Sequence, residues 1–196
     1  MRHAASIIIC EEHSALSAML RSVLLMLSQH RPAGNPLDCA SLRAILFYLD
    51  EFPEKRHHRK ETQLLFPKLR ARTPLSRELL DRLDEDHARG EHRIRELEHL
   101  LLGCEMMGES RFKAFEDAAT RYVQFYFEHM LLEEREVLPL AEQVLTAEDW
   151  AELDEAFTAD RDPLGGGAAP DASYDALFTR IVNLVPAPLG LGPART

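Results

Sequence analysis

The chain has little glycine or proline before residue 160, no apolar run long enough to cross a membrane, and no excess of basic residues. Its 33 Asp and Glu residues outnumber 23 Lys and Arg residues, and the formal net charge is -10. An acidic surface disfavours sequence-independent binding of nucleic acid, which depends on basic patches that displace counterions. It also disfavours anionic membranes, and no apolar run approaches the roughly 18 residues of a membrane span. We therefore expect neither a nucleic-acid nor a membrane partner.

Cysteine is scarce as well. Cys10, Cys39 and Cys104 are far apart, odd in number, and not arranged as CxxC. This pattern suggests neither a disulfide framework nor a thiolate metal site. The apolar run in MRHAASIIICEEH is too short for the core of a signal peptide, and acidic residues follow it at once. Reduced thiols are typical of the cytosol, so the predicted location is cytoplasmic.

The residues that are abundant favour helices. Ala, Leu, Glu and Arg dominate, and apolar residues recur at steps of three and four. The pattern predicts helices over residues 6–30, over 38–72 (interrupted at Pro53 and ended by Pro67 and RTP), from 76 to near GCEMMGES at 103–110, and over 111–144 (its last turns broken by Pro139), the third with Ser76 as its N-cap. A fifth, short helix over residues 146–157 begins with TAED, which resembles a capping box. Four long helices with short connections predict an all-α, up-down-up-down four-helix bundle.

The end of the chain differs in composition. We assign residues 1–159 to the bundle with its short fifth helix, and residues 160–172, which include PLGGGAAP, to a linker. Residues 173–196 form a predicted C-terminal helix and an extended tail. This extension is too small to fold alone. We expect it to dock on the bundle or on a second copy of the chain, which would give a homodimer.

Each predicted bundle helix has an apolar stripe that a histidine interrupts. On three helices a glutamate follows four positions later, and therefore lies on the same helical face. The chain around His57 also repeats around His129, because in both places a glutamate follows after four positions and a proline after ten. The candidate metal ligands are His13, His57, Glu61, His87, Glu91, His129 and Glu133.

Carboxylates on these stripes point to a bound cation. Burying a carboxylate costs several kcal/mol unless it is paired or binds a metal. The stripes hold no matching Lys or Arg, since Arg56 and Arg59 point away and Lys60 lies at the edge. Imidazole and carboxylate ligands without thiolate suit iron or manganese, and zinc is a further option. Seven ligands exceed the needs of one ion, so we predict two, bridged by Glu61 and Glu133.

These residues resemble the hemerythrin-like family, also called the HHE cation-binding domain. The resemblance covers about residues 5–145 and rests on His13, HHRKE with LFP, DEDHARGE, and HMLLEE with VLP. The C-terminal segment resembles the extension of a bacterial subgroup. The family implies a non-heme di-iron centre with two bridging carboxylates and an oxo or hydroxo bridge. One iron would take His87 and His129, with position 91 as a further ligand. The other would take His13 and His57 and keep an open position for dioxygen, peroxide or nitric oxide.

One position departs from the oxygen-carrier pattern of the family. Its usual histidine is replaced here by Glu91. A carboxylate would stabilise ferric iron, which disfavours reversible oxygen carriage and favours redox or peroxide chemistry, or iron sensing. Glu91 either binds the metal or supports a ligand from outside. The neighbouring His92 is an alternative whose spacing aims it off the face. We expect His58 beside the ligand face, in an outer layer or at the surface.

Three functions remain open from the sequence. The first is a di-iron protein that binds or senses oxygen, peroxide, nitric oxide, or iron and redox state. The second is an enzyme with peroxidase-like or catalase-like activity, or one that repairs iron–sulfur clusters. The third is an interaction module whose site is vestigial or filled with zinc, or whose histidines are merely satisfied in the core.

Overall fold

The computed structural model describes residues 3–33, 37–166, 179 and 181, and these contain helices but no β-strand. The three long helices are α1 (Ala4–Ala33), α5 (Arg77–Met107) and α6 (Phe112–Leu132). Between α1 and α5 lie α2 (Cys39–Leu49), η1 (Asp50–His57), α3 (His58–Lys60), η2 (Glu61–Leu65), α4 (Phe66–Arg72) and η3 (Pro74–Ser76). The remaining elements are η4 (Gly108–Arg111), η5 (Glu133–Val137), α7 (Leu138–Val144), α8 (Ala147–Ala159) and η6 (Pro163–Gly165).

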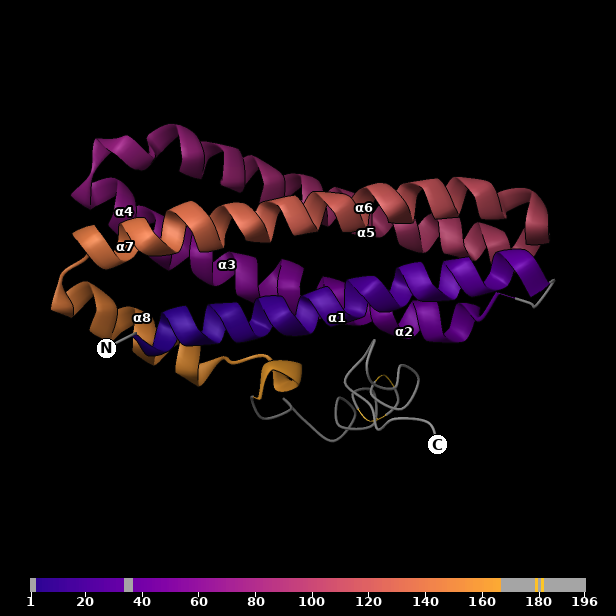
Figure 1. Cartoon of the computed structure of the whole chain (residues 1–196), viewed down its shortest axis with the longest axis horizontal. Helices are drawn as coiled ribbons and strands as arrows, with labels where there is room; N and C mark the ends of the chain where they lie inside the picture. Colours follow the sequence, from indigo (N-terminus) through magenta and orange to yellow (C-terminus); the bar gives the residue numbers. More distant parts are fainter. Residues whose placement is uncertain (1–2, 34–36, 167–178, 180, 182–196) are drawn as a thin grey trace.

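The elements form an antiparallel bundle. Figure 1 shows α1, the series from α2 to α4, α5, and the series from α6 to α7 running side by side in alternating directions. Within it, α5 packs on α6 and α2, while α1 packs on α6. The short helix α8 turns back and packs along α1 (Figure 1). The predicted all-α, up-down-up-down bundle is confirmed.

Three short segments of the bundle are π-helical, namely η1, η2 and η5. In a π-helix each N–H bonds to the carbonyl five residues back, which widens the turn. A proline causes this shift, because it has no N–H and its ring clashes with the carbonyl four residues back. Pro67 follows η2 and Pro139 follows η5, and both helices continue beyond them. The prolines therefore interrupt the regular α-helix without stopping it, and the helices end at Arg72 and Val144, the predicted ends.

Two hydrophobic clusters fill the bundle, and a polar layer separates them. The first cluster includes Leu16, Leu20, Leu49, Phe52, Ile94, Phe115 and Ile181. The second includes Ile9, Leu65, Phe66, Leu83, Val137, Leu153 and Phe157. In α1, for example, His13 lies between Ile9 of the second cluster and Leu16 of the first. The histidines that interrupt the stripes therefore meet at one level of the bundle.

The N-termini of α8 and α5 test two capping signals predicted from the sequence. At α8, the Thr146 hydroxyl accepts from the Asp149 N–H while the Asp149 carboxylate accepts from the Thr146 N–H, so the predicted capping box is confirmed. Ser76 precedes α5, but its hydroxyl donates to the Thr73 carbonyl and does not cap the helix.

The predicted C-terminal extension lies mostly outside the described residues, as does the linker after residue 166. The expected contact of this extension with a second copy of the chain also falls outside them. Within the extension, Ile181 is fully buried in the first hydrophobic cluster. Among the described helices, none combines the length and apolar character needed to cross a lipid bilayer.

Candidate metal centre

Two groups of buried histidine and glutamate side chains occupy the polar layer. One consists of His13, His57, Glu61 and Glu133, and the other of His58, Glu61, His87 and His129. Within each group the potential ligand atoms all lie within 4.8 Å of one another. No member is more than 7% exposed. Glu61 belongs to both groups, so the two lie next to each other.

In the first group, two imidazoles face each other across two carboxylates. The Nε2 atoms of His13 and His57 are 3.2 Å apart. Glu61 Oε1 lies 3.2 Å from His57 Nε2, and Glu133 Oε2 lies 3.2 Å from His13 Nε2. The donors therefore come from α1, η1, η2 and η5, and they converge on one small volume.

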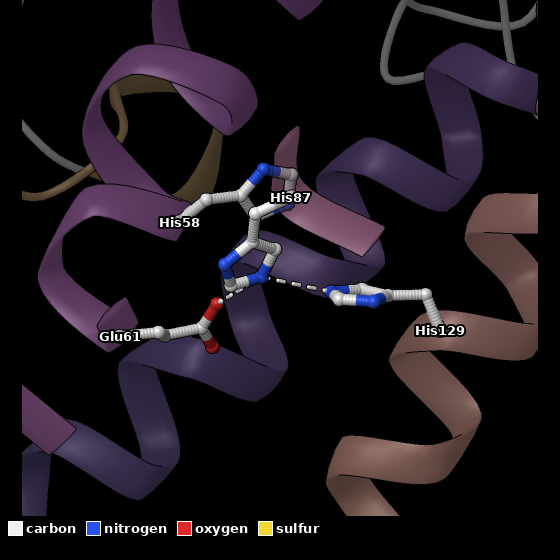
Figure 2. Close-up of side chains that lie close together, drawn as sticks. All are labelled: His58, Glu61, His87 and His129. Carbon is white, nitrogen blue, oxygen red and sulfur yellow. Dashed lines mark hydrogen bonds and ion pairs between the residues drawn. The ribbon is translucent and has the colours of Figure 1, made fainter. Parts of the chain in front are cut away.

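The second group repeats this arrangement. The Nε2 atoms of His87 and His129 are 3.1 Å apart. Glu61 Oε2 lies 3.5 Å from His87 Nε2, a contact drawn as a dashed line in Figure 2, and Glu133 Oε1 lies 3.4 Å from His129 Nε2. Each glutamate thus turns one oxygen toward each group. This is the arrangement that two carboxylate bridges between neighbouring cations require.

The sequence left His58 in an outer layer or at the surface, and the structure excludes the surface. Its side chain is buried, and its ring stacks on His87 with centroids 4.2 Å apart (Figure 2). It belongs to the second group of candidate ligands. A signal was present in the sequence, because Glu54 precedes His58 by four residues and the two side chains contact at 3.2 Å. In the pairs singled out from the sequence the glutamate follows the histidine by four residues, whereas here it precedes the histidine by four.

Glu91, in contrast, lies outside both groups. Its side chain is 53% exposed and pairs with Arg95 on the surface of α5. Here the expectation of a ligand at position 91 is wrong, and the neighbouring His92 is exposed as well. The core stripe of α5 passes from His87 to Gly90, three positions on, and not to position 91.

The space beside Gly90 holds a buried carboxylate. A Cβ atom on Gly90 would lie 2.8 and 2.9 Å from the two Glu54 oxygens, and closer still to the Tyr126 hydroxyl. Tyr122 and Tyr126 both donate hydrogen bonds to Glu54 Oε1. Burial raises the pKa of Glu54 to about 7, although these two phenols act to lower it. Glu54 and the tyrosines therefore fill the place where a ligand from α5 was expected, and they support His58.

The Nδ1 atom of each histidine contacts an outer partner, on the side away from the centre. The partners are Glu134 for His13 at 2.9 Å, Glu12 for His57 at 2.6 Å, Glu54 for His58 at 3.2 Å, Thr62 for His87 at 2.8 Å and Asp86 for His129 at 3.8 Å. Outer partners of this kind orient a metal-binding imidazole and fix which nitrogen carries the proton. For the four histidines whose Nε2 contacts are given above, this leaves Nε2 directed into the centre.

Three carboxylate oxygens at the centre lack hydrogen-bond partners. Both oxygens of Glu133 and Oε2 of Glu61 are buried without one among the described residues. An unsatisfied buried carboxylate oxygen is costly, and a cation bound between the two glutamates would satisfy these oxygens. The residues therefore fit a metal centre with nitrogen and oxygen donors.

The electrostatics of the layer agree with this. Burial and the neighbouring histidines hold the pKa of His58 and His87 well below the usual value, so both rings are neutral and offer a lone pair. Burial also acts to lower the pKa of His57, but the carboxylates of Glu61 and Glu12 raise it well above the usual value. Without a cation, protons on such rings balance the buried carboxylates. Metal binding replaces those protons.

An all-α bundle with buried imidazoles and two central carboxylates has the features of a cation-binding helical bundle. The comparison with protein families agrees, because the model of the Hemerythrin HHE cation binding domain matches residues 7–141. The chain belongs to this family. Comparisons with curated proteins and with solved structures gave no match.

Proposed function

We propose that this chain is a di-iron protein that binds or senses dioxygen, peroxide, nitric oxide, or the iron and redox state of the cytoplasm. One observation carries the proposal: Glu61 and Glu133 each direct one oxygen toward each of two imidazole clusters. Nitrogen and oxygen donors without thiolate suit iron, and they also accept manganese or zinc. A pair of irons supplies coordination and electron transfer to a small ligand.

The two ions would have unequal sets of protein donors. His58, His87 and His129 would give three imidazoles to one ion, whereas His13 and His57 would give two to the other. Glu61 belongs to both groups, and Glu133 contacts His13 in the first and His129 in the second. An ion held by His13 and His57 would therefore have fewer protein donors and more room for an external ligand. Since the donors are at most 7% exposed, a diatomic molecule or peroxide fits the site better than a large substrate.

An enzyme that reduces peroxide is the second candidate, and one observation favours it. The phenol ring of Tyr126 lies 5.5 Å from the ring of His58, and Tyr122 lies 4.8 Å from Tyr126. Buried phenols at this distance can donate single electrons to the centre. Turnover of peroxide by the iron-loaded protein separates this enzyme from a binding protein or sensor.

The proposal is tested by metal content and an absorption spectrum, on protein purified without a metal-affinity tag. We expect about two irons per chain, because the structure has two groups of candidate donors. We also expect near-ultraviolet absorption bands that change when peroxide is added. The matched variants are His58→Ala and Glu91→Ala. His58→Ala should lose about one iron, whereas Glu91→Ala should keep both.

The opposite pattern would contradict the ligand assignment. If Glu91→Ala loses iron and His58→Ala does not, position 91 binds the metal after all. Zinc alone, or no metal after anaerobic addition of ferrous iron, would refute the di-iron proposal. An interaction module with a vestigial or zinc-filled site would then be the better reading.

A further inference from the structure

The segment that follows α8 contacts Glu12, and Glu12 in turn contacts His57 of the first group of candidate ligands. This glutamate of α1 is 3% exposed. Its Oε2 lies 2.6 Å from His57 Nδ1, and its Oε1 accepts the N–H of Asp162 at 2.8 Å. One buried carboxylate therefore joins a candidate metal ligand to a backbone group about 150 residues further along the chain.

The same segment has further buried anchors. The Tyr48 hydroxyl donates to Asp162 Oδ2 at 2.7 Å, and the Leu164 N–H donates to Asp162 Oδ1 at 2.8 Å. Lys60 donates to the Asp160 carbonyl at 2.5 Å and lies 3.5 Å from Glu12 Oε1. These contacts hold the segment against α1, α2 and α3, and they leave Glu12 little freedom to turn away from His57.

His57 differs in this respect from the other four histidines of the centre. Their outer partners are Glu134, Glu54, Thr62 and Asp86, which like Glu12 belong to the bundle helices. Among the described hydrogen bonds, only the partner of His57 is also bonded to a residue that follows α8. The contact is thus specific to the cluster of His13 and His57, the one with fewer imidazoles.

We propose that Glu12 is a positioning residue through which the segment of residues 160–164 and metal binding at the His13–His57 cluster stabilise each other. This inference rests on the proposed metal-binding function. A proton on His57 Nδ1, directed at Glu12, keeps Nε2 free for a metal, and a cation on Nε2 makes the Nδ1–H group a stronger donor. The stronger hydrogen bond fixes Glu12, and so fixes the acceptor of the Asp162 N–H. Such coupling acts equally in both directions.

Hydrogen exchange on the full chain measures one direction of the coupling. The protein is compared without metal and with ferrous iron under anaerobic conditions, and peptides that contain Asp162 and Leu164 are followed by mass spectrometry. A peptide from the start of α8, around Trp150, reports any general gain in stability. We expect iron to slow exchange at residues 162–164 by about fivefold more than in the reference peptide, at the low end of typical coupling.

A pair of variants measures the reverse direction. Tyr48→Phe removes one anchor of the segment and touches no candidate ligand. Thr146→Val is the control, because it removes a hydroxyl hydrogen bond at the far end of α8. In competition with a graded chelator, Tyr48→Phe should release one of its two irons at about fivefold lower chelator concentration and the other at the wild-type concentration. Thr146→Val should release both at the wild-type concentration.

The outcomes separate this inference from the proposed function. If the wild-type protein holds two irons but Tyr48→Phe behaves like the control, or iron slows both peptides equally, the inference is overturned and the di-iron proposal stands. If Tyr48→Phe weakens both irons alike, the effect is general loss of structure and the inference is again overturned. If the wild-type protein binds no iron, both fall together.

Discussion

Replacing Gly90 by alanine should distort the support of His58. Gly90 lies in the middle of α5, where alanine would ordinarily stabilise a helix by about 1 kcal/mol. Here the added Cβ would lie 2.8 and 2.9 Å from the oxygens of Glu54, and closer still to the Tyr126 hydroxyl. Both groups are buried and bonded to each other, so neither can simply swing into solvent.

The magnitude follows from three terms. Forcing extra atoms into a packed core costs about 1–3 kcal/mol. Loss of the Tyr126–Glu54 hydrogen bond leaves a buried polar group without a partner, which costs roughly 1–3 kcal/mol more. After subtraction of the gain in helix propensity, we expect Gly90→Ala to lower the free energy of unfolding by about 3 kcal/mol, within a range of roughly 1–5. For a chain of this length, that corresponds to a fall in Tm of roughly 6–12 °C.

The assay is thermal and denaturant unfolding of the metal-free protein, with Gly103→Ala as the control. Gly103 is in the same helix, and its added Cβ would meet only Arg111 carbons at 3.7 and 3.9 Å. Gly103→Ala should therefore gain up to about 1 kcal/mol. Adding Tyr126→Phe to Gly90→Ala should recover part of the loss, because it removes the nearest atom. A Gly90→Ala protein as stable as Gly103→Ala would refute the reasoning.

Three further outcomes are expected. Loading metal to about a hundred times its Kd should add about 2.7 kcal/mol to the free energy of unfolding, and calorimetry that shows no rise in Tm would contradict a preformed site. The hydrogen bond from Arg72 holds the pKa of Asp149 well below 3.8, so its contribution to stability is present above about pH 4 and is lost as the pH falls below that. Asp149→Asn should therefore differ from wild type in denaturant unfolding at pH 6, and the difference should shrink toward pH 2; a difference independent of pH would count against this. Leu153→Ala should cost about 2–5 kcal/mol in the same assay, since this α8 residue is fully buried; a loss below about 1 kcal/mol would show that α8 is dispensable.

The difference between Glu91 and Gly90 shows where sequence reasoning on α5 failed. The buried residues of this helix alternate in steps of three and four, through Leu83, His87, Gly90 and Ile94. This is the spacing of helices that pack nearly parallel along their length. A glutamate four residues after a histidine does lie on the same helical side, but the next inward position was the glycine. Because glycine carries no side chain, it gave no sign in the sequence of what would occupy its place.

His58 was missed for a related reason. On a regular α-helix with an interruption at Pro53, His57 lies on the ligand face and His58 beside it. In the structure, His57 ends the π-helical segment η1, the π-helical segment η2 begins at Glu61, and both histidines are buried in the centre. A π turn changes the angle between successive side chains, so the spacing rules of an α-helix do not carry through it.

The sequence by itself determined the helical class, the bundle, the capping box of α8 and six of the residues that meet in the polar layer, because apolar periodicity and local capping act over a few neighbouring residues. The tertiary structure decided which side chain occupies each side of the centre. It brought Glu54, Tyr122 and Tyr126 into the space beside Gly90, and it placed Glu12 between His57 and Asp162. These contacts join residues far apart in the chain. Their partners are set by how the helices pack, which no local pattern in the sequence encodes.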